Sequence, residues 1–263
     1  MSKAQLPTVT AKTLARKRLL RNAPGYDAEG EWLAGMPLLD AARAYAGDTL
    51  LLAFSGGKDS VAMWLWLREV APDVRIVPFF MDMIPGLKLI DDMLSYYQDF
   101  FGQHIYHMIH PSFYNDLNYY VFQTPENVRL IRALDLVWFT RQFVANLVAE
   151  DAGVPGRPLH AMGLRRKDNP IRSGLMTNAR VIGTRHSSHF YPIWDWTTPQ
   201  VADIIRRHGA KLPIGYRLWG RNLVNLEYNV LKQVRVHFPA DYEIIKTWYP
   251  LIEAEFFRYE VVR

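Results

Sequence analysis

The stretch that decides the fold is residues 49–60, which read TLLLAFSGGKDS. Its first half, Thr49 to Phe54, is a short continuous apolar run of the kind found in strands buried on both faces of a sheet. The residues after it, VAMWLWLREVAP, have the composition of a helix. The two glycines between strand and helix allow a tight turn that directs several backbone N–H groups at one point. We therefore expect an anion-binding loop at residues 55–60.

The side chains of this loop suit a phosphate ligand. The helix that starts near Asp59 adds its positive dipole end, Lys58 adds a mobile cation, and the two serines add hydroxyl donors. Asp59 is also placed to hold Mg2+ between phosphate oxygens. The loop is not a Walker A motif, because Leu52 stands where the first glycine of that motif is required. The alternative is a strand-to-helix connection that merely needs glycine. The residues assigned to nucleotide binding here are Ser55, Gly56, Gly57, Lys58, Asp59 and Ser60.

Strand and helix patterns alternate along the chain outward from this loop. Further strands are expected at residues 75–80, 104–109 and 159–164, with short strands at 180–183 and 190–193. Helices are expected at 87–101, 128–150 and 198–208. This alternation predicts an α/β fold: an open, mostly parallel twisted sheet with helices on both faces. We divide the chain into a basic N-terminal arm (1–23), a nucleotide-binding α/β domain (24–221) and a helical C-terminal extension (222–263) packed on that domain.

The net charge of +5 is unevenly distributed. Residues 1–22 carry six basic and no acidic side chains, residues 23–156 carry eight basic and seventeen acidic ones, and residues 157–221 carry twelve basic and three acidic ones. Arginine-rich segments suit phosphate oxygens. Segment 157–221 and the arm therefore favour nucleic acid as a partner, with a solvated basic face as the alternative. A partner protein or a homo-oligomer also stays open.

Apolar runs in the sequence are too short to span a membrane. We expect no membrane partner and a cytoplasmic location, with an organellar transit peptide as the alternative reading of the basic start.

A second basic motif, MGLRRKDNPIR at residues 162–172, follows an apolar strand. Ligands of open parallel sheets bind at the carboxyl ends of the strands. Arg165 and Arg172 are therefore candidates to stabilise charge on a reacting phosphoryl group. The alternative is a solvated basic loop.

Asp82 ends the second expected strand and is a candidate ligand for Mg2+ or a substrate amine; a helix cap or turn residue is the alternative. The three histidines of HIYHMIH (104–110) do not share one face of a strand, so a metal site there is not expected.

Four segments together resemble a known family. They are LAFSGGKDS (52–60), FFMDMIPG (79–86), GLRRKD with Arg172 (163–172), and YPIWDW (191–196). They are similar to motifs of the adenine nucleotide alpha-hydrolase, or PP-loop, superfamily, and most similar to its branch of phosphoadenosine phosphosulfate (PAPS) reductases and ATP sulfurylase small subunits. The resemblance implies ATP and Mg2+ as cofactors, with Asp59 and Asp82 at the metal. It also places Asp82, Gly163 and Arg165 in the nucleotide site and gives catalytic roles to Lys58, Asp59, Arg165 and Arg172.

The sequence departs from the reductases of this family in one respect that decides the chemistry. Those enzymes attack sulfur with a cysteine near the C-terminus, whereas this sequence contains no cysteine and reads LWGRNLVN at residues 218–225. Thiol redox steps and cysteine-held iron–sulfur clusters are thereby excluded for these residues. The intact SGGKDS instead resembles members that bind ATP and release pyrophosphate. We expect chemistry at the ATP α-phosphate, such as adenylylation of a substrate; the alternative is a non-redox accessory protein that senses nucleotides or sulfonucleotides and acts with nucleic acid or a partner protein.

Overall fold

The computed structural model describes residues 26–29, 31, 33–156, 158–168, 189–223 and 225–261. The basic arm, Arg172 and the short strand expected at 180–183 lie outside the described residues. Within them, no helix is long and apolar enough to cross a membrane.

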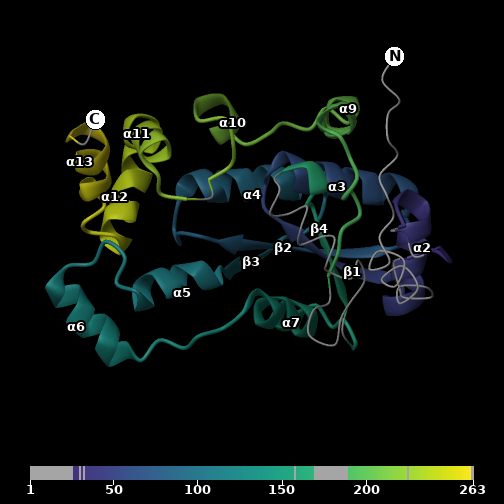
Figure 1. The fold of residues 1–263 in the computed structure, drawn as a ribbon, viewed down its shortest axis with the longest axis horizontal. Helices are drawn as coiled ribbons and strands as arrows, with labels where there is room; N and C mark the ends of the chain where they lie inside the picture. The colour runs from purple at the N-terminus through teal and green to yellow at the C-terminus, as the bar shows by residue number, and fades with distance from the viewer. Residues whose placement is uncertain are drawn as a thin grey trace, which may run out of the picture.

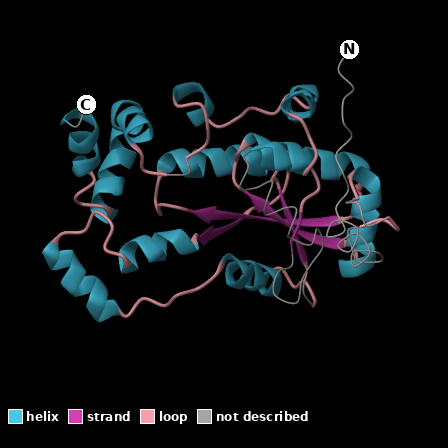
Figure 2. Cartoon of the chain, viewed as in Figure 1, coloured by secondary structure: helices cyan, strands magenta, loops and turns pink. Residues whose placement is uncertain are grey.

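Five parallel strands form one sheet in the order β3-β2-β1-β4-β5 (Figures 1 and 2). The strands are β1 (Thr49–Phe54), β2 (Arg75–Asp82), β3 (Tyr106–Ile109), β4 (Leu159–Met162) and β5 (His189–Phe190). The central strand β1 pairs with β2 on one side, Leu50 lying opposite Ile76, and with β4 on the other, Leu50 lying opposite Leu159. Because the strand order reverses at β1, a crevice for ligands is expected beside its carboxyl end.

Helices cover both faces of this sheet, so the predicted α/β fold class is confirmed. Helices α3 and α4 lie along one face and α7 along the other, while α9 packs on α3 (Figure 1). Alternate residues of β1 point to opposite faces of the sheet. Leu50 and Leu52 belong to the larger core on one face, and Leu51 packs with α7 on the other. The helices are α2 (Gly35–Ala46), α3 (Lys58–Val70), α4 (Lys88–Phe101), α5 (Pro111–Asn118), α6 (Pro125–Leu134), α7 (Arg141–Asp151), α9 (Thr198–Arg207), α10 (Gly215–Leu218), α11 (Tyr228–His237), α12 (Pro239–Trp248) and α13 (Glu253–Val261), with the 3-10 turn η1 (Arg166–Asp168).

The prediction of a single helix at residues 128–150 is wrong. The chain forms α6 and α7 instead, separated by residues 135–140. Asp135 ends α6 in the left-handed conformation, with φ of 45°, and the Thr140 hydroxyl caps α7 by accepting from the backbone N–H of Phe143 at 3.1 Å. The local stop and start signals therefore outweigh the continuous apolar periodicity of this segment.

The C-terminal residues are helical, as predicted, and the break expected at Pro239 is where α12 begins. The buried carboxylate of Asp241 accepts hydrogen bonds from the backbone N–H groups of Lys88 and Leu89, at 2.8 and 2.9 Å. Asp241 thus satisfies free N–H groups at the start of α4, which ties α12 to the helix that flanks the loop of residues 55–60.

Candidate functional site

The loop after β1 depends on two glycines that act differently. Gly56 has φ of 69°, and a Cβ at this position would collide with the sulfur of Met93 in α4. Gly57 has an ordinary φ of −72° and caps the N-terminus of α3. Gly56 therefore forms the turn, whereas a Cβ at Gly57 would lie 3.2 Å from Ser55 Oγ and 3.5 Å from Asn222 Nδ2, so glycine lets these two side chains approach the helix end.

Two serine hydroxyls brace the loop from within. Ser60 Oγ donates to the carbonyl oxygen of Gly57 at 2.9 Å and accepts from the backbone N–H of Ser55 at 3.2 Å. Ser55 Oγ lies 3.1 Å from Ser60 Oγ and accepts from the backbone N–H of Gly57 at 3.3 Å. Both serines thus fix the loop conformation before any ligand arrives.

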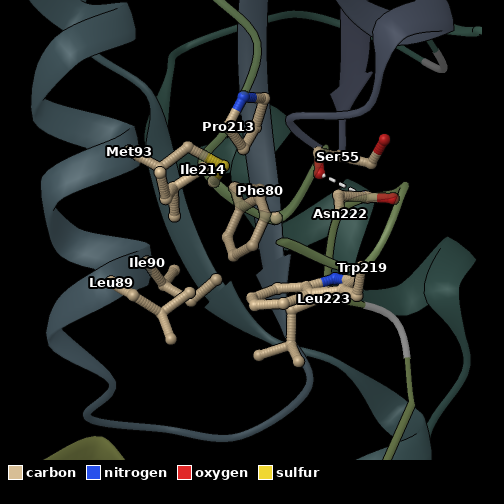
Figure 3. Close-up of a pocket in the computed structure, with 11 residues that line it drawn as sticks. Ser55, Phe80, Leu89, Ile90, Met93, Pro213, Ile214, Trp219, Asn222 and Leu223 are labelled. Atoms are coloured by element: carbon tan, nitrogen blue, oxygen red, sulfur yellow. Dashed lines mark hydrogen bonds between the residues drawn. The ribbon is translucent and has the colours of Figure 1, made fainter. Parts of the chain in front are cut away.

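The N-terminus of α3 is covered by a segment from much later in the chain, residues 213–223. The backbone N–H of Lys58 donates to the hydroxyl oxygen of Tyr216 at 2.8 Å. Asn222 Nδ2 donates to the carbonyl oxygen of Ser55 at 2.9 Å, a bond that is drawn in Figure 3. Burial raises the pKa of the Tyr216 phenol, so its hydroxyl is protonated at neutral pH. No local pattern in the sequence singles out Tyr216 or Asn222, because they reach the loop only through the fold.

Asp59 and Arg165 meet behind the loop. Asp59 Oδ2 accepts from Lys58 Nζ at 2.6 Å, and Asp59 Oδ1 lies 2.8 Å from Arg165 Nε. The second contact is an ion pair without hydrogen-bond geometry, since neither of its two atoms has a hydrogen-bond partner among the described residues. Arg165 itself is only 4% exposed, and its guanidinium also donates to Asp168 at 2.7 Å and to Thr198 at 3.3 Å. Arg165 therefore links the starts of α3 and α9 to η1, and its contact with nucleotide phosphate stays a prediction.

Gly163 lies where β4 meets α3. A Cβ on Gly163 would lie 2.8 Å from the backbone nitrogen of Ser60 and 2.9 Å from the carbonyl carbon of Asp59. These are backbone atoms, which cannot move away by a side-chain rotation. Glycine is therefore required here for close packing, and its direct contact with a nucleotide stays a prediction.

Asp82 is buried at the end of β2 and already has two partners. Its Oδ2 lies 3.1 Å from His107 Nε2 on β3, and its Oδ1 accepts from the backbone N–H of Ile84 at 3.2 Å. The hydrogen bond to Asp82 raises the pKa of His107. His110 caps α5 instead, and burial lowers its pKa to about 4. His107 and His110 therefore have different partners, Asp82 and the start of α5.

The fit of Mg2+ can be tested on these contacts. Both predicted metal ligands, Asp59 and Asp82, already bind cationic or hydrogen-bonding partners, and the described residues hold no group of three or more His, Asp or Glu that could coordinate a metal. The side chains present therefore do not by themselves form a magnesium site.

A pocket opens beside the loop, between α4, the end of β2 and residues 213–223 (Figure 3). Its cavity volume is about 20 Å³, little more than the room that one water needs. The wall is mostly apolar, with Phe80, Met93 and Trp219 among its large side chains, and Ser55 and Asn222 provide the polar end. Trp219 Nε1 is buried and has no hydrogen-bond partner among the described residues.

The basic residues of segment 157–221, which favours nucleic acid as a partner, differ in their surroundings. Arg207 pairs with Glu69 at 2.8 Å and with Asp203 at 3.2 Å, and Arg206 pairs with Asp203 at 3.4 Å. Arg166 and Lys167 are exposed on η1. Arg180 and Arg185 lie outside the described residues. Carboxylates thus lie beside the arginines of α9 and offset much of their positive charge.

Known proteins resemble this chain in fold. No protein-family model and no curated protein matches the sequence. Solved structures that match include the U34-tRNA thiolase NcsA from Methanococcus maripaludis with its [4Fe-4S] cluster, at 15% identity and a TM-score of 0.45, covering 91% of this chain and 78% of that one. A PAPS reductase from Candida auris, in complex with phosphate, matches at 16% identity and a TM-score of 0.45, covering 73% and 91%. The NH3-dependent NAD synthetase from Campylobacter jejuni matches at 12% identity and a TM-score of 0.40, covering 80% and 86%.

With TM-scores of 0.45 or less and identities of 16% or less, these structures assign neither a family nor an activity to this chain. The assignment of the site therefore rests on the residues of this chain.

Proposed function

We propose that residues 55–60 bind the phosphates of an adenine nucleotide, with ATP as the physiological ligand. One observation carries this proposal. The first backbone N–H of α3, on Lys58, is directed at the hydroxyl oxygen of Tyr216, 2.8 Å away. An oxygen acceptor thus occupies the position in front of the helix where a phosphate oxygen would be bound.

The apolar pocket beside the loop is the proposed site of the base, which requires Met93 and Trp219 to move apart because the pocket has room for little more than one water. A purine has two apolar faces and acceptor nitrogens on its edge. Phe80 and Met93 offer apolar contact, and the unsatisfied indole N–H of Trp219 offers a donor. Because Ser55 belongs to both the pocket wall and the phosphate loop, one nucleotide can occupy the two together.

The reaction that these residues suit is nucleotidyl transfer. An acceptor atom forms a bond to the α-phosphorus, the bond from that phosphorus to the bridging oxygen breaks, and pyrophosphate leaves with the electron pair. The Lys58 side chain is 31% exposed and can turn from Asp59 toward the departing charge. The helix dipole and the loop N–H groups retain the pyrophosphate. Arg165, held behind Asp59, fixes the helix start that carries these groups.

A second function is supported by a specific contact. Tyr216 already satisfies the Lys58 N–H, and Asp59 already holds the Lys58 ammonium, so the ligand-free site is internally paired. An accessory protein that senses a nucleotide and transmits its binding to nucleic acid or a partner protein would use the same displacement of Tyr216 without turnover.

Pyrophosphate release separates the two functions. We expect the protein with ATP and magnesium to release pyrophosphate, alone or with sulfate, a nucleoside or DNA as acceptor. Lys58→Ala should abolish the release, while Lys88→Ala, at an exposed lysine of α4, should leave it unchanged. ATP binding without pyrophosphate release under any of these conditions would favour the sensing function. Absence of both binding and release would refute the nucleotide assignment.

A further inference from the structure

A broad hollow lies on α3 and α9, apart from the loop of residues 55–60. In Figure 1, α9 lies on the side of α3 that faces away from the sheet. The cavity volume of the hollow is about 590 Å³, within the range of about 300 to 1,000 Å³ that ligand sites occupy. Its wall includes Trp66, which comes eight residues after Lys58 on α3 and so lies about 12 Å further along that helix. The hollow therefore has the size of a second binding site.

Two indole rings form the aromatic part of this hollow. Trp66 and Trp196 meet edge to face, with ring centroids 6.2 Å apart and an angle of 77° between the ring planes. Both side chains are half-buried, so part of each ring is open to solvent. Rings of this kind offer apolar faces on which planar ligands stack. The pair therefore suits a ligand that contains an aromatic ring.

The polar groups of the wall favour a ligand that also carries negative charge. Arg206 is 74% exposed and its bond to Asp203 is long, at 3.4 Å, so its guanidinium is available to an anion. The amide oxygen of Gln200 accepts from the backbone N–H and from the hydroxyl of Thr197, at 2.8 Å each, and its amide nitrogen has no partner among the described residues. In the wall, two arginines lie beside one aspartate, which disfavours a cation, the other class of ligand that binds to indole faces.

Further basic side chains adjoin the hollow. The backbone N–H of Arg166 donates to the carbonyl oxygen of Trp194 at 2.8 Å, which holds η1 next to the segment that carries Trp196. Arg166 and Lys167 are exposed on η1. Exposed positive charge therefore comes from two elements, η1 and α9. A ligand that uses both must extend beyond one small molecule, which favours a chain of nucleotides over a single nucleotide.

We propose that this hollow binds a single-stranded nucleic acid, with a base stacked on Trp196 and a phosphate at Arg206. Aromatic rings combined with arginines are the means by which proteins bind single strands without reading their sequence. A duplex does not fit this chemistry, because its bases are stacked on one another and their faces are covered. The site does not depend on nucleotide binding at residues 55–60, so the two proposals are tested separately.

Binding of short labelled oligonucleotides to the full chain tests this proposal. Fluorescence anisotropy at about 50 mM salt should show that a single strand of about 12 nucleotides, DNA or RNA, binds at least about 10-fold more tightly than a duplex of the same length. The slope of log affinity against log salt should be small, about 0.7 to 1.4, the effect of one or two phosphate contacts. Absence of single-strand binding at about 100 µM protein, or a duplex bound as tightly, would overturn the proposal.

Substitutions of Trp196 separate stacking from charge. Trp196→Ala should weaken single-strand binding at least about 5-fold and leave the salt slope unchanged, because it removes a ring and no cation. Trp196→Phe keeps an aromatic face and should lose less affinity than Trp196→Ala. Trp138→Ala is the matched control, since Trp138 is 57% exposed and lies outside the hollow, and it should leave binding unchanged.

A variant of Gln200 tests the site without removing a ring. Gln200→Glu keeps an oxygen that accepts from Thr197 at the start of α9, but it places a negative charge in the hollow. It should weaken single-strand binding at least about 3-fold and leave ATP affinity unchanged, whereas Gln233→Glu, the same change on α11, should affect neither. Circular dichroism verifies the fold of each variant. Wild-type affinity for single strands in folded Trp196→Ala or Gln200→Glu protein would overturn the proposal.

Discussion

The loop after β1 and the segment after β4 lie on neighbouring strands at the same edge of the sheet, yet they hold their charges in different ways. In residues 55–60, the backbone N–H of Lys58 and its side chain lie near the surface with partners that a ligand could replace. After β4, the guanidinium of Arg165 is buried and engaged by Asp59, Asp168 and Thr198. Both segments look like phosphate sites in the sequence. In the structure the first has partners that a ligand could replace, whereas the guanidinium of the second is buried and paired within the chain; we infer that the first receives an anion and the second supports it.

This difference arises because a charge that is removed from water needs a partner inside the protein. A buried guanidinium must be paired, so its partners determine its role more than its charge does. A helix N-terminus has N–H groups that its own helix cannot satisfy, so another acceptor pairs with them, which here is the Tyr216 hydroxyl. The predictions below separate the two kinds of residue.

Arg165→Ala should have the largest effect, on stability. Removing one member of a buried ion pair typically costs about 3 to 5 kcal/mol, because the other charges lose their partner. We expect a loss of this size in denaturant unfolding. Arg166→Ala is the matched control, since the neighbouring arginine is exposed on η1, and it should change stability by less than about 0.5 kcal/mol. Equal stability of the two variants would show that Arg165 is not a structural support.

Gly57→Val should affect binding more than folding. The backbone at Gly57 has an ordinary φ, so a side chain there causes no backbone strain, but its Cβ would lie 3.2 Å from Ser55 Oγ and 3.5 Å from Asn222 Nδ2 and would push these groups in front of α3. We expect ATP affinity, measured by calorimetry, to fall at least about 100-fold, or about 2.7 kcal/mol. Gly56→Ala should behave in the opposite way: its positive φ predicts a loss of about 1 to 2 kcal/mol of stability before any clash with Met93. A folded Gly57→Val protein with unchanged ATP affinity would contradict the account of the loop.

Tyr216→Phe should have a smaller effect of the opposite sign. The hydroxyl competes with phosphate for the Lys58 N–H, and a hydrogen bond of this kind contributes about 0.5 to 1.5 kcal/mol. Removing it should raise ATP affinity by about 2- to 10-fold. Tyr45→Phe, at an exposed tyrosine of α2, should have no effect. A fall in affinity would mean that the Tyr216 hydroxyl contacts the nucleotide and does not compete with it.

The arginines of α9 should give the smallest change. Since Arg206 and Arg207 are already paired with Asp203 and Glu69, reversing both to glutamate should weaken nucleic-acid binding only modestly and leave ATP affinity unchanged. Each lost phosphate contact should lower the slope of log affinity against log salt by about 0.9. Lys232→Glu on α11 serves as control. If the wild-type protein does not bind DNA or RNA even at low salt, nucleic acid is not the partner.

Elements that depend on neighbouring residues could be predicted from the sequence. Contacts between residues far apart in the chain became known only from the structure. The strand, turn and helix around SGGKDS could be predicted because glycine placement and apolar runs act over a few residues. The pairing of Arg165 with Asp59 could not, since a motif shows where a charge lies in the chain but not whether the fold buries it. Tyr216 and Asn222 carried no signal because each meets the loop across more than 150 residues. The split of the expected helix at 128–150 had a signal in Asp135 and Thr140, which the apolar pattern masked.

The central claim is that the Lys58 N–H exchanges the Tyr216 hydroxyl for a nucleotide phosphate. A crystal structure of the protein with a non-hydrolysable ATP analogue tests it most directly. We predict a phosphate oxygen within hydrogen-bond distance of the Lys58 nitrogen, the base in the pocket beside Trp219, and the Tyr216 hydroxyl moved away from α3. An analogue bound elsewhere, with the bond between Lys58 and Tyr216 intact at 2.8 Å, would contradict the account.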